Sequence, residues 1–273
     1  MSQDDRDQFT DQKYLKTEQY HNAANLNARI ELHSRFRTNQ EDFKVWVFSR
    51  FLDNLPENAR VLELGCGAGD LWSINAGRIP PGWEIVLSDF SPGMLENTQT
   101  VLRSYPIEFQ YKVVDAQAID FEDAVFDAVI ANHMLYHVPD REKAIAEIHR
   151  VLKPGGVLFA ATNGQGHMGE MRNLVHSIDP EAELTLGEDE FGLENGRAQL
   201  SPYFSTILIL HYENSLQVTE TDPMVAYILS SKRSALIEEN PQLAAQMIEE
   251  TIKADGVFHI QIHIGMFVAV KAQ

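Results

Sequence analysis

The chain has 273 residues, of which 44% are hydrophobic, and this content excludes an intrinsically disordered protein. Its 22 Lys and Arg residues against 40 Asp and Glu residues give a formal net charge of −18 at pH 7. Because affinity for a phosphate backbone comes mainly from clustered cations, we expect no nucleic acid partner. No apolar run approaches the roughly 18 residues that a membrane-spanning helix needs, so we expect no membrane partner.

The amino-terminal residues and the cysteine content bear on location. Residues 1–12 are polar and rich in acids, with neither the basic segment nor the apolar segment of a secretory signal. Cys66 is the single cysteine, so it has no internal disulfide partner. Both features favour a reducing compartment, and we expect a cytoplasmic location.

The first part of the chain is predicted to be helical. Apolar residues recur at helical spacing within residues 13–55, and Pro56 ends the pattern. The sequence therefore predicts an N-terminal helical extension over residues 1–55.

From residue 60 onward, short apolar runs alternate with amphipathic stretches. The predicted strands are 61–64, 84–87, 109–114, 126–131 and 157–162. The predicted helices between them are 69–77, 92–104 and 141–152. Strands separated by helices of this length are typical of βαβ units, so we expect an α/β fold with a parallel sheet.

Residues 163–200 interrupt this alternation, and we expect them to form an inserted lid. Two more strands are predicted at 207–212 and 258–270, with helices between them that begin at Asp222-Pro223 and Asn240-Pro241. No change of composition marks a linker. Residues 56–273 are therefore expected to form one seven-stranded domain with the lid at about 163–200.

A glycine-rich segment follows the first predicted strand, with Gly65, Gly67 and Gly69 at alternate positions. Such glycines let the main chain turn sharply and approach a ligand closely. The dinucleotide pattern G-x-G-x-x-G fails, because Asp70 stands three residues after Gly67, and no phosphate-loop Gly-Lys-Ser/Thr follows. Glu63 and Asp70 would repel a pyrophosphate and suit a cationic ligand.

Carboxylates also follow the next two predicted strands. Asp89 follows Gly69 by 20 residues, the position from which an acid typically binds a ribose diol. Phe90 and Met94 are candidates for apolar contacts with a purine, and Asp115 for a bond to an exocyclic amine. The alternatives are that Asp89 only caps the following helix and that Asp115 is an ordinary turn acid.

These motifs together resemble the class I S-adenosylmethionine-dependent methyltransferase family over roughly residues 60–162. The motifs that carry the resemblance are Glu63–Gly69, Asp89, Asp115-Ala116, Asp127–His133 and Leu152–Gly156. The resemblance implies a Rossmann-like sheet with helices on both faces and an antiparallel C-terminal strand. It also implies S-adenosyl-L-methionine as cofactor, S-adenosyl-L-homocysteine as product, and a small-molecule acceptor methylated by in-line displacement.

The family's binding roles transfer to matching positions of this sequence. The glycine loop would hold the methionyl end, Asp89 the ribose, and Asp115 with Ala116 the adenine. Residues 14–20 resemble the helix that small-molecule members fold over the cofactor, which implicates Tyr20. The complete expected cofactor set is Tyr20, Glu63, Gly65, Cys66, Gly67, Gly69, Asp89, Phe90, Met94, Asp115, Ala116, Asn132 and His133.

The segment after the fourth predicted strand supplies the catalytic candidates His133, Tyr136 and His137. An imidazole titrates near neutrality, so either histidine could act as a general base, and Tyr136 could orient a substrate. A base is needed only if the attacking atom must lose a proton. The alternative is that His133 faces the cofactor through its main chain while Tyr136 and His137 pack a turn.

Other polar residues give weaker signals. His167 and Arg172 in the expected lid could reach a substrate, although a solvated helix face also explains them. His259 and His263 would lie about 13 Å apart along a strand, too far to chelate one metal. With no His-Glu-x-x-His motif and no paired cysteines, we expect no metal site.

Three alternatives to a small-molecule methyltransferase stay open. A protein-modifying methyltransferase is one, because an acidic cleft would attract a basic peptide. A non-catalytic S-adenosylmethionine-binding protein is another, and a nicotinamide-dependent oxidoreductase, disfavoured by the glycine spacing, is the third. The oligomeric state is expected to be a monomer or a homodimer.

Overall fold

The computed structural model describes residues 23–182, 187–230 and 234–273, so Tyr20 lies outside the described residues. Residue contacts divide the chain into two compact units, which we call the helical unit and the sheet unit. The helical unit comprises the described residues within 1–40, 164–186 and 213–263. The sheet unit comprises those within 41–163, 187–212 and 264–273.

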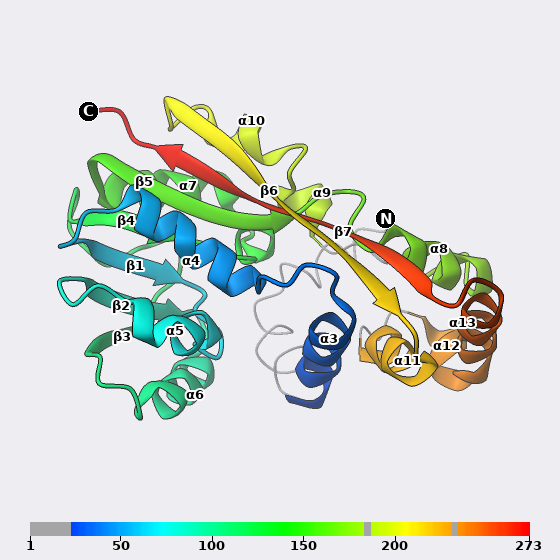
Figure 1. Cartoon of the computed structure of the whole chain (residues 1–273). Coiled ribbons are helices and arrows are strands. Elements are labelled where there is room, and N and C mark those ends of the chain that lie inside the picture. Colours follow the sequence, from blue (N-terminus) through cyan, green and yellow to red (C-terminus); the bar gives the residue numbers. More distant parts are fainter. Residues whose placement is uncertain (1–22, 183–186, 231–233) are drawn as a thin grey trace. The chain divides into compact units, whose positions relative to one another are not determined.

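The described strands form one seven-stranded sheet in the order β3-β2-β1-β4-β5-β7-β6 (Figure 1). They are β1 (Arg60–Leu64), β2 (Glu84–Asp89), β3 (Phe109–Val113), β4 (Phe126–Ile130), β5 (Leu152–Asn163), β6 (Thr206–Val218) and β7 (Phe258–Val270). All pairs among β1 to β5 are parallel, whereas β7 runs antiparallel to β5. The expected Rossmann-like α/β fold with an antiparallel C-terminal strand is therefore confirmed.

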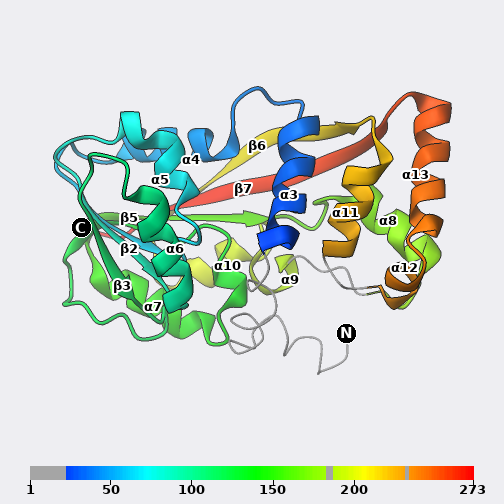
Figure 2. The same cartoon turned by 90° about the horizontal axis from the view of Figure 1, so that it is seen from below.

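The helices of the sheet unit flank this sheet. They are α4 (Phe43–Asn54), α5 (Asp70–Asn75), η2 (Ala76–Arg78), α6 (Pro92–Leu102), η3 (Leu135–His137), α7 (Arg141–Val151), α9 (Glu188–Phe191) and α10 (Gly196–Leu200). Helices α4 and α5 cover one face, and α7 covers the opposite face (Figures 1 and 2). Both faces of the central strands are thus buried, which explains why β1, β2 and β4 read as continuous apolar runs.

The main core of the sheet unit is rich in aromatic residues. Phe48, Phe51 and Trp72 are fully buried between the sheet and helices α4 and α5. Phe51 meets Phe159 of β5 edge to face at a ring-centroid distance of 4.8 Å. Rings packed in this way contribute about 0.5–1.5 kcal/mol each beyond the burial of their area. This packing gives the strand ends that carry the candidate site a rigid support.

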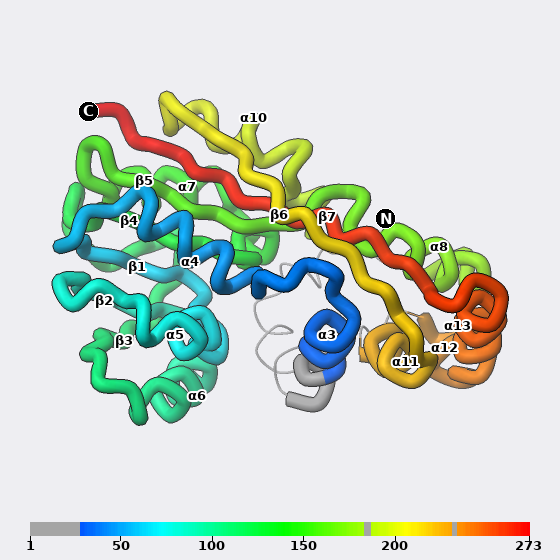
Figure 3. Tube along the Cα trace, in the orientation of Figure 1, coloured from blue at the N-terminus to red at the C-terminus, as the bar shows by residue number. Residues whose placement is uncertain are grey.

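The helical unit contains five described helices and the outer halves of β6 and β7. The helices are α3 (Ala23–Phe36), α8 (Gly169–Ile178), α11 (Thr221–Ser230), α12 (Ala235–Glu239) and α13 (Gln242–Asp255). Gly256 ends α13 with φ +79°, the left-handed conformation expected of it. In Figure 3 the trace reaches this unit three times, before α4, after β5 and between β6 and β7.

The helical stretch predicted over residues 13–55 is interrupted in the structure. Helix α3 ends at Phe36, Arg37 then forms a bridge with Leu216, and Asp42 caps α4 by accepting a 2.8 Å bond from the Lys44 amide. Residues 37–42 are all polar, so they offer no apolar face that would favour one continuous helix. Helix α4 lies in the sheet unit, so the contact-based division differs from the boundary expected at residue 55, which stays a prediction.

The boundary between the two compact units also divides the expected lid at residues 163–200. Residues 164–186 fall in the helical unit, and residues 187–212 fall in the sheet unit. In the sheet unit, the amide of Leu193 donates to the carbonyl of Asn163 at 3.0 Å. The Thr162 hydroxyl donates to the carbonyl of Phe191 at 2.5 Å. These bonds attach the segment that carries α9 to the end of β5.

Candidate functional site

The glycine loop connects β1 to α5 with three residues in the left-handed region. Gly65, Gly67 and Gly69 have φ angles of +70°, +56° and +80°. A left-handed backbone costs a residue with a Cβ roughly 1–2 kcal/mol, so this loop needs glycine at each place. Gly69 ends the loop as the N-cap of α5, whose first amides are directed toward the loop.

The three glycines differ in what a Cβ at each position would meet. At Gly65 a Cβ would lie 3.0 Å from the Cβ of Met134, and at Gly69 it would lie 2.9 Å from Cγ2 of Thr98. At Gly67 no atom of the described residues, chain neighbours aside, lies within 4 Å of that position. Two glycines therefore permit close packing within the protein, and Gly67 leaves an open main-chain face that a ligand can approach.

Glu63 lies inside the strand that leads into the loop. Its side chain is 3% exposed, and its carboxylate accepts a 2.6 Å hydrogen bond from the indole of Trp72. The pKa of Glu63 is raised to about 7, chiefly by burial and also by the charge of Asp89, while the hydrogen bond from Trp72 opposes both. The structure thus gives Glu63 a contact that fixes the strand–helix junction, while its role toward a cofactor stays a prediction.

Asp89 connects the ends of three strands. Its Oδ2 accepts a 3.1 Å bond from the Gly67 amide, and its Oδ1 accepts a 2.8 Å bond from the Ser91 amide. Its carbonyl accepts a 3.2 Å bond from the amide of Val114, which follows β3. One carboxylate thus bonds the amide of Ser91, the N-cap residue of α6, and also lies beside the open face of Gly67, while a helix-capping role of Asp89 stays a prediction.

The residues expected to enclose the adenine follow β2 and β3. Phe90 and Met94 are half-buried, and Ala116 is buried. Asp115 accepts bonds of 2.9 Å from the Gln117 amide and 3.0 Å from the Gln117 side chain, which is the turn geometry of the alternative interpretation. The positions of these residues are compatible with adenine binding, which stays a prediction.

Cys66 is buried in the loop, with its Sγ 3.7 Å from the hydroxyl of Thr98. Burial raises the pKa of the thiol well above its usual range, so the protonated form prevails at neutral pH. Thr98 also donates to the carbonyl of Gly67 and lies 2.9 Å from the carbonyl of Met94. Cys66 is thus a packing residue of the loop.

His133 follows β4 and has φ +51°, an unusual value for a residue with a Cβ. Its amide donates to the carbonyl of Ala161 at 2.9 Å, and Oδ1 of Asn132 accepts from the Ala161 amide at 3.3 Å. The imidazole lies 5.5 Å from the ring of Phe43, centroid to centroid. Two bonds to β5 therefore hold the left-handed backbone, and an aromatic neighbour contacts the ring.

Tyr136 and His137 form part of η3, with ring centroids 4.5 Å apart. Tyr136 is buried, and a Cβ at Gly187 would stand 2.5 Å from its ring. Arg141 forms an ion pair with Glu190 that connects α7 with α9. Tyr136 thus packs against the segment that carries α9, and a catalytic role for this pair stays a prediction.

The other sequence candidates lie in the helical unit. His167 is buried, His259 is exposed, and His263 is half-buried. Arg172 donates to the carbonyl of Gln165. Among the described residues, no group of three or more His, Cys, Asp or Glu side chains is arranged to hold a metal ion.

The structure adds residues that the sequence interpretation did not single out. Trp72 contacts Glu63, Thr98 contacts the glycine loop, and Phe43 contacts His133. Gly187 leaves room for the ring of Tyr136. Trp72 lies on the first turns of α5, a position from which a donor can reach the preceding strand. Phe43 lies 90 residues from His133, and no local pattern predicts that contact.

A hollow of about 430 Å³ lies at the amino-terminal ends of the strands, opposite the edge that carries the glycine loop. Its charged lining is paired internally, with Lys153 bonded to Asp127 at 2.8 Å and Arg60 3.7 Å from Glu84. Ligands of open α/β sheets bind at the carboxyl ends of the strands, so the glycine-loop edge is the better candidate. No helix among the described residues is long and apolar enough to span a membrane.

The fold and this edge define a class of protein: an α/β protein with a Rossmann-like sheet that carries a glycine loop and acids at the carboxyl ends of its strands.

Comparison with known proteins specifies the class. Residues 62–160 match the family model described as a methyltransferase domain. The chain is 34% identical over 119 residues to the ubiquinone/menaquinone biosynthesis C-methyltransferase UbiE of Pectobacterium carotovorum. That alignment covers 42% of this chain and 47% of that protein. The chain is 39% identical over 107 residues to the demethylmenaquinone methyltransferase of Thermus thermophilus, covering 39% of this chain and 47% of that protein. The matches therefore span just under half the length of each relative.

A solved structure extends the likeness of fold. Phosphoethanolamine N-methyltransferase 2 of Haemonchus contortus, in complex with phosphomonomethylethanolamine and S-adenosylhomocysteine, has a TM-score of 0.56 and 20% identity. The alignment covers 98% of this chain and 60% of that one. Residues 62–160 thus match a methyltransferase domain, and the resemblance to the class I S-adenosylmethionine-dependent methyltransferase family read from the motifs is confirmed.

Proposed function

We propose that the protein transfers a methyl group from S-adenosyl-L-methionine to a small-molecule acceptor by in-line displacement and releases S-adenosyl-L-homocysteine. One observation carries the proposal most strongly. The main chain of Gly67 has an open face beside the Asp89 carboxylate, at the carboxyl edge of a parallel sheet. An uncovered main chain next to an acid suits a ligand with a cationic end and a ribose diol.

The residues present fit this cofactor. The loop from Gly65 to Gly69 would hold the methionyl end, where a Cβ at Gly67 would fill the open face. Asp89 would bind the ribose, while Phe90 and Met94 would supply apolar contacts with the base. The additional contributions expected of Glu63, Cys66, Asp115, Ala116, Asn132 and Tyr20 belong to the same proposal.

The bound cofactor supplies an electrophilic methyl group on a positively charged sulfur. The protein then has to align the acceptor and exclude water. His133 is the first candidate for a general base, because its backbone is fixed at the end of β4, adjacent to the residue that contacts Gly65. His137 is the second candidate, and Tyr136 would orient the acceptor.

The comparisons support the reaction type more than the acceptor. One relative is named as a ubiquinone/menaquinone biosynthesis C-methyltransferase and the other as a demethylmenaquinone methyltransferase. The matching domain model covers the part of the chain that carries the glycine loop. The helical unit has no residue within 62–160. We therefore propose a small-molecule acceptor without naming its scaffold, and a cytoplasmic monomer or homodimer remains a prediction.

A transfer assay tests the proposal. The protein is incubated with S-adenosylmethionine radiolabelled in the methyl group and with either a small-molecule extract or a protein pool that includes histones. We expect label in the small-molecule fraction and none in protein. Label confined to protein would favour the protein-modifying alternative, and tight cofactor binding with repeated absence of transfer would favour a non-catalytic protein.

A further inference from the structure

One side chain of α6, that of Thr98, contacts the glycine loop at several points. Thr98 is fully buried, and its hydroxyl donates to the carbonyl of Gly67. The same hydroxyl oxygen lies 3.7 Å from Sγ of Cys66. The methyl carbon Cγ2 lies 2.9 Å from the position that a Cβ at Gly69 would take. A single residue outside the loop therefore contacts three residues within it.

Both polar main-chain atoms of Gly67 are bonded to side chains. Its amide donates to Oδ2 of Asp89 at 3.1 Å, and its carbonyl accepts from Thr98. The two peptide planes that meet at Gly67 are therefore each held, one from the end of β2 and one from α6. Glycine has more main-chain freedom than any other residue, so a loop with three glycines loses much entropy when a ligand orders it. Bonds that order the loop beforehand reduce this cost.

Thr98 differs from an ordinary helix threonine, whose hydroxyl bonds the carbonyl four residues earlier. Thr100 on the same helix has that ordinary arrangement, with its exposed hydroxyl 2.9 Å from the carbonyl of Glu96. Thr98 lies 2.9 Å from the carbonyl of Met94 and has a further acceptor in the carbonyl of Gly67. Because a hydroxyl carries one proton, the two carbonyls share one donor. Removing this hydroxyl therefore takes a bond away from the loop, whereas removing that of Thr100 does not.

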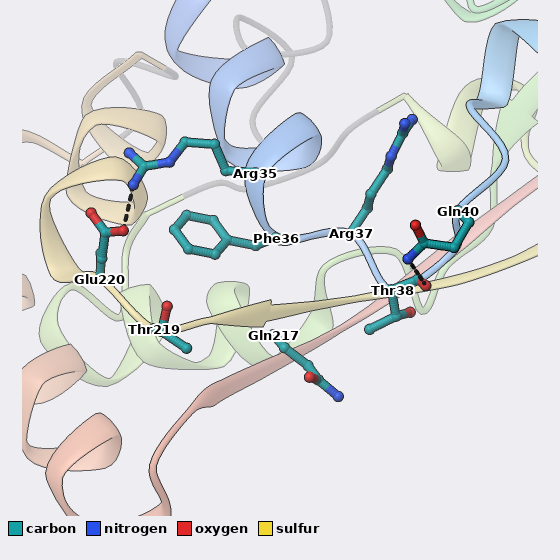
Figure 4. A pocket seen from close by; sticks show the side chains of 8 residues that line it. All are labelled: Arg35, Phe36, Arg37, Thr38, Gln40, Gln217, Thr219 and Glu220. Carbon is teal, nitrogen blue, oxygen red and sulfur yellow. Dashed lines mark hydrogen bonds and ion pairs between the residues drawn. The ribbon is translucent and has the colours of Figure 1, made fainter.

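A groove of about 610 Å³ in the helical unit lacks such buried support. It is lined by side chains around the end of α3 and the end of β6, which Figure 4 shows. Arg35 in this groove forms ion pairs with Glu31 and Glu220, and all three side chains are exposed. Exposed ion pairs hold long side chains only weakly. We therefore assign no ligand to the groove and locate the inference at the loop, where a buried side chain holds the main chain.

We propose that Thr98 is a positioning residue of the cofactor site, whose hydroxyl holds the glycine loop in the conformation that binds S-adenosylmethionine. The inference rests on the proposed function, because it concerns the loop assigned to that cofactor. Thr98 acts through the main chain of Gly67 and needs no contact with the ligand. Since Met94 is expected to contact the adenine, Thr98 also connects the two parts of the expected site.

Affinity for S-adenosylhomocysteine, measured by calorimetric titration, separates the hydroxyl from the volume of the side chain. Thr98→Val keeps the shape and removes the hydroxyl, so we expect affinity to fall by about fivefold to tenfold. Thr98→Ser keeps the hydroxyl and should bind much like the wild type. Thr100→Val is the matched control, because it removes an exposed hydroxyl of the same helix. Thr98→Ala and Thr98→Ser differ only by the hydroxyl, and this pair repeats the comparison if Thr98→Val fails to fold.

A measurement on the free protein shows whether the hydroxyl orders the loop. In protein labelled with ¹⁵N-glycine, the amide signal of Gly67 is identified by its absence from Gly67→Ala. We expect this signal to be broadened by exchange in Thr98→Val, but not in the wild type or Thr100→Val. Saturation with S-adenosylhomocysteine should sharpen it again, because the ligand orders the loop. A merely structural Thr98 would lower the free energy of unfolding and leave this signal unchanged.

The outcomes separate the two proposals. Weaker binding by Thr98→Val, with no methyl transfer by the wild type to any pool, would sustain the positioning role and overturn the proposed function. Methyl transfer to small molecules, with equal affinity in the wild type and Thr98→Val, would sustain the proposed function and overturn the positioning role. Equal losses of affinity in Thr98→Ser and Thr98→Ala would also overturn it, because the hydroxyl would then have no effect.

Discussion

The glycine loop of the sheet unit and the contacts between α3 and α11 in the helical unit bring polar groups together in contrasting ways. In the loop, the groups are main-chain amides within five consecutive residues, and a bonded carboxylate from the next strand fixes them. Between α3 and α11, the groups are side chains far apart in the sequence, as in the bond from Arg29 to the Ser230 hydroxyl 201 residues away. A run of main chain can therefore be recognised from its local sequence, whereas side chains gathered from distant segments cannot.

The largest expected effect is at Gly67. In Gly67→Val the new side chain fills the open face, so we expect affinity for S-adenosylhomocysteine to fall by at least about a hundredfold, or about 3 kcal/mol. Gly77→Ala is the control, because that Cβ also meets open space but has no left-handed backbone to strain. Calorimetric titration measures both, and unchanged affinity of the Gly67 variant would contradict the assigned face.

Asp89→Ala should have the next largest effect on binding. The change removes the proposed ribose acceptor and also the acceptor of the Gly67 and Ser91 amides, so we expect a loss of about 2–3 kcal/mol in binding free energy. Asp120→Ala removes an exposed acid paired with Lys112 and serves as the control. If Asp89→Ala binds S-adenosylhomocysteine like the wild type in calorimetry, the ribose assignment is wrong.

Gly69→Ala tests packing and not ligand contact. Its Cβ would lie 2.9 Å from Cγ2 of Thr98, and its φ is +80°, so we expect about 2 kcal/mol of lost stability in chemical unfolding. Thr98→Ser removes that methyl group and keeps the hydroxyl that bonds the Gly67 carbonyl. The double variant should regain part of the loss, and full additivity of the two changes would contradict the contact.

Glu63 predicts a smaller effect that depends on pH. Its pKa is about 7 when folded and near 4.5 when unfolded, so the folded state binds the proton more strongly. The contribution of Glu63 to the free energy of unfolding should therefore be greatest below pH 4.5. It should fall by at most about 1.4 kcal/mol per pH unit up to about pH 7. Glu63→Gln should flatten this slope in unfolding measured between pH 5 and 8, and an equal slope in both proteins would contradict the account.

Much of the sheet unit follows from the sequence, because its signals are local. Continuous apolar runs identify doubly covered strands, and the glycine spacing identifies a loop whose three left-handed angles the structure shows. The acid at Asp89 is also predictable, since its distance from the loop is set by one βαβ unit. The sequence did not reveal that this carboxylate binds the Gly67 amide.

The remainder depends on contacts that no local pattern encodes. The aromatic neighbour of His133, Phe43, precedes the first strand, and Gly187 meets Tyr136 from a segment expected to be a lid. The separation of α3 from α4 arises because Arg37 pairs with a strand 179 residues further along. His33 and His167 look like isolated residues in the sequence, and their rings lie parallel at a centroid distance of 6.4 Å only in the folded chain.

A crystal structure of the protein grown with S-adenosylhomocysteine tests the central claim most directly. The account predicts density along the main chain from Gly65 to Gly69, with a ribose hydroxyl within hydrogen-bond distance of the Asp89 carboxylate. An empty loop at saturating ligand, or the same ligand bound at the opposite ends of the strands near Lys153, would contradict it.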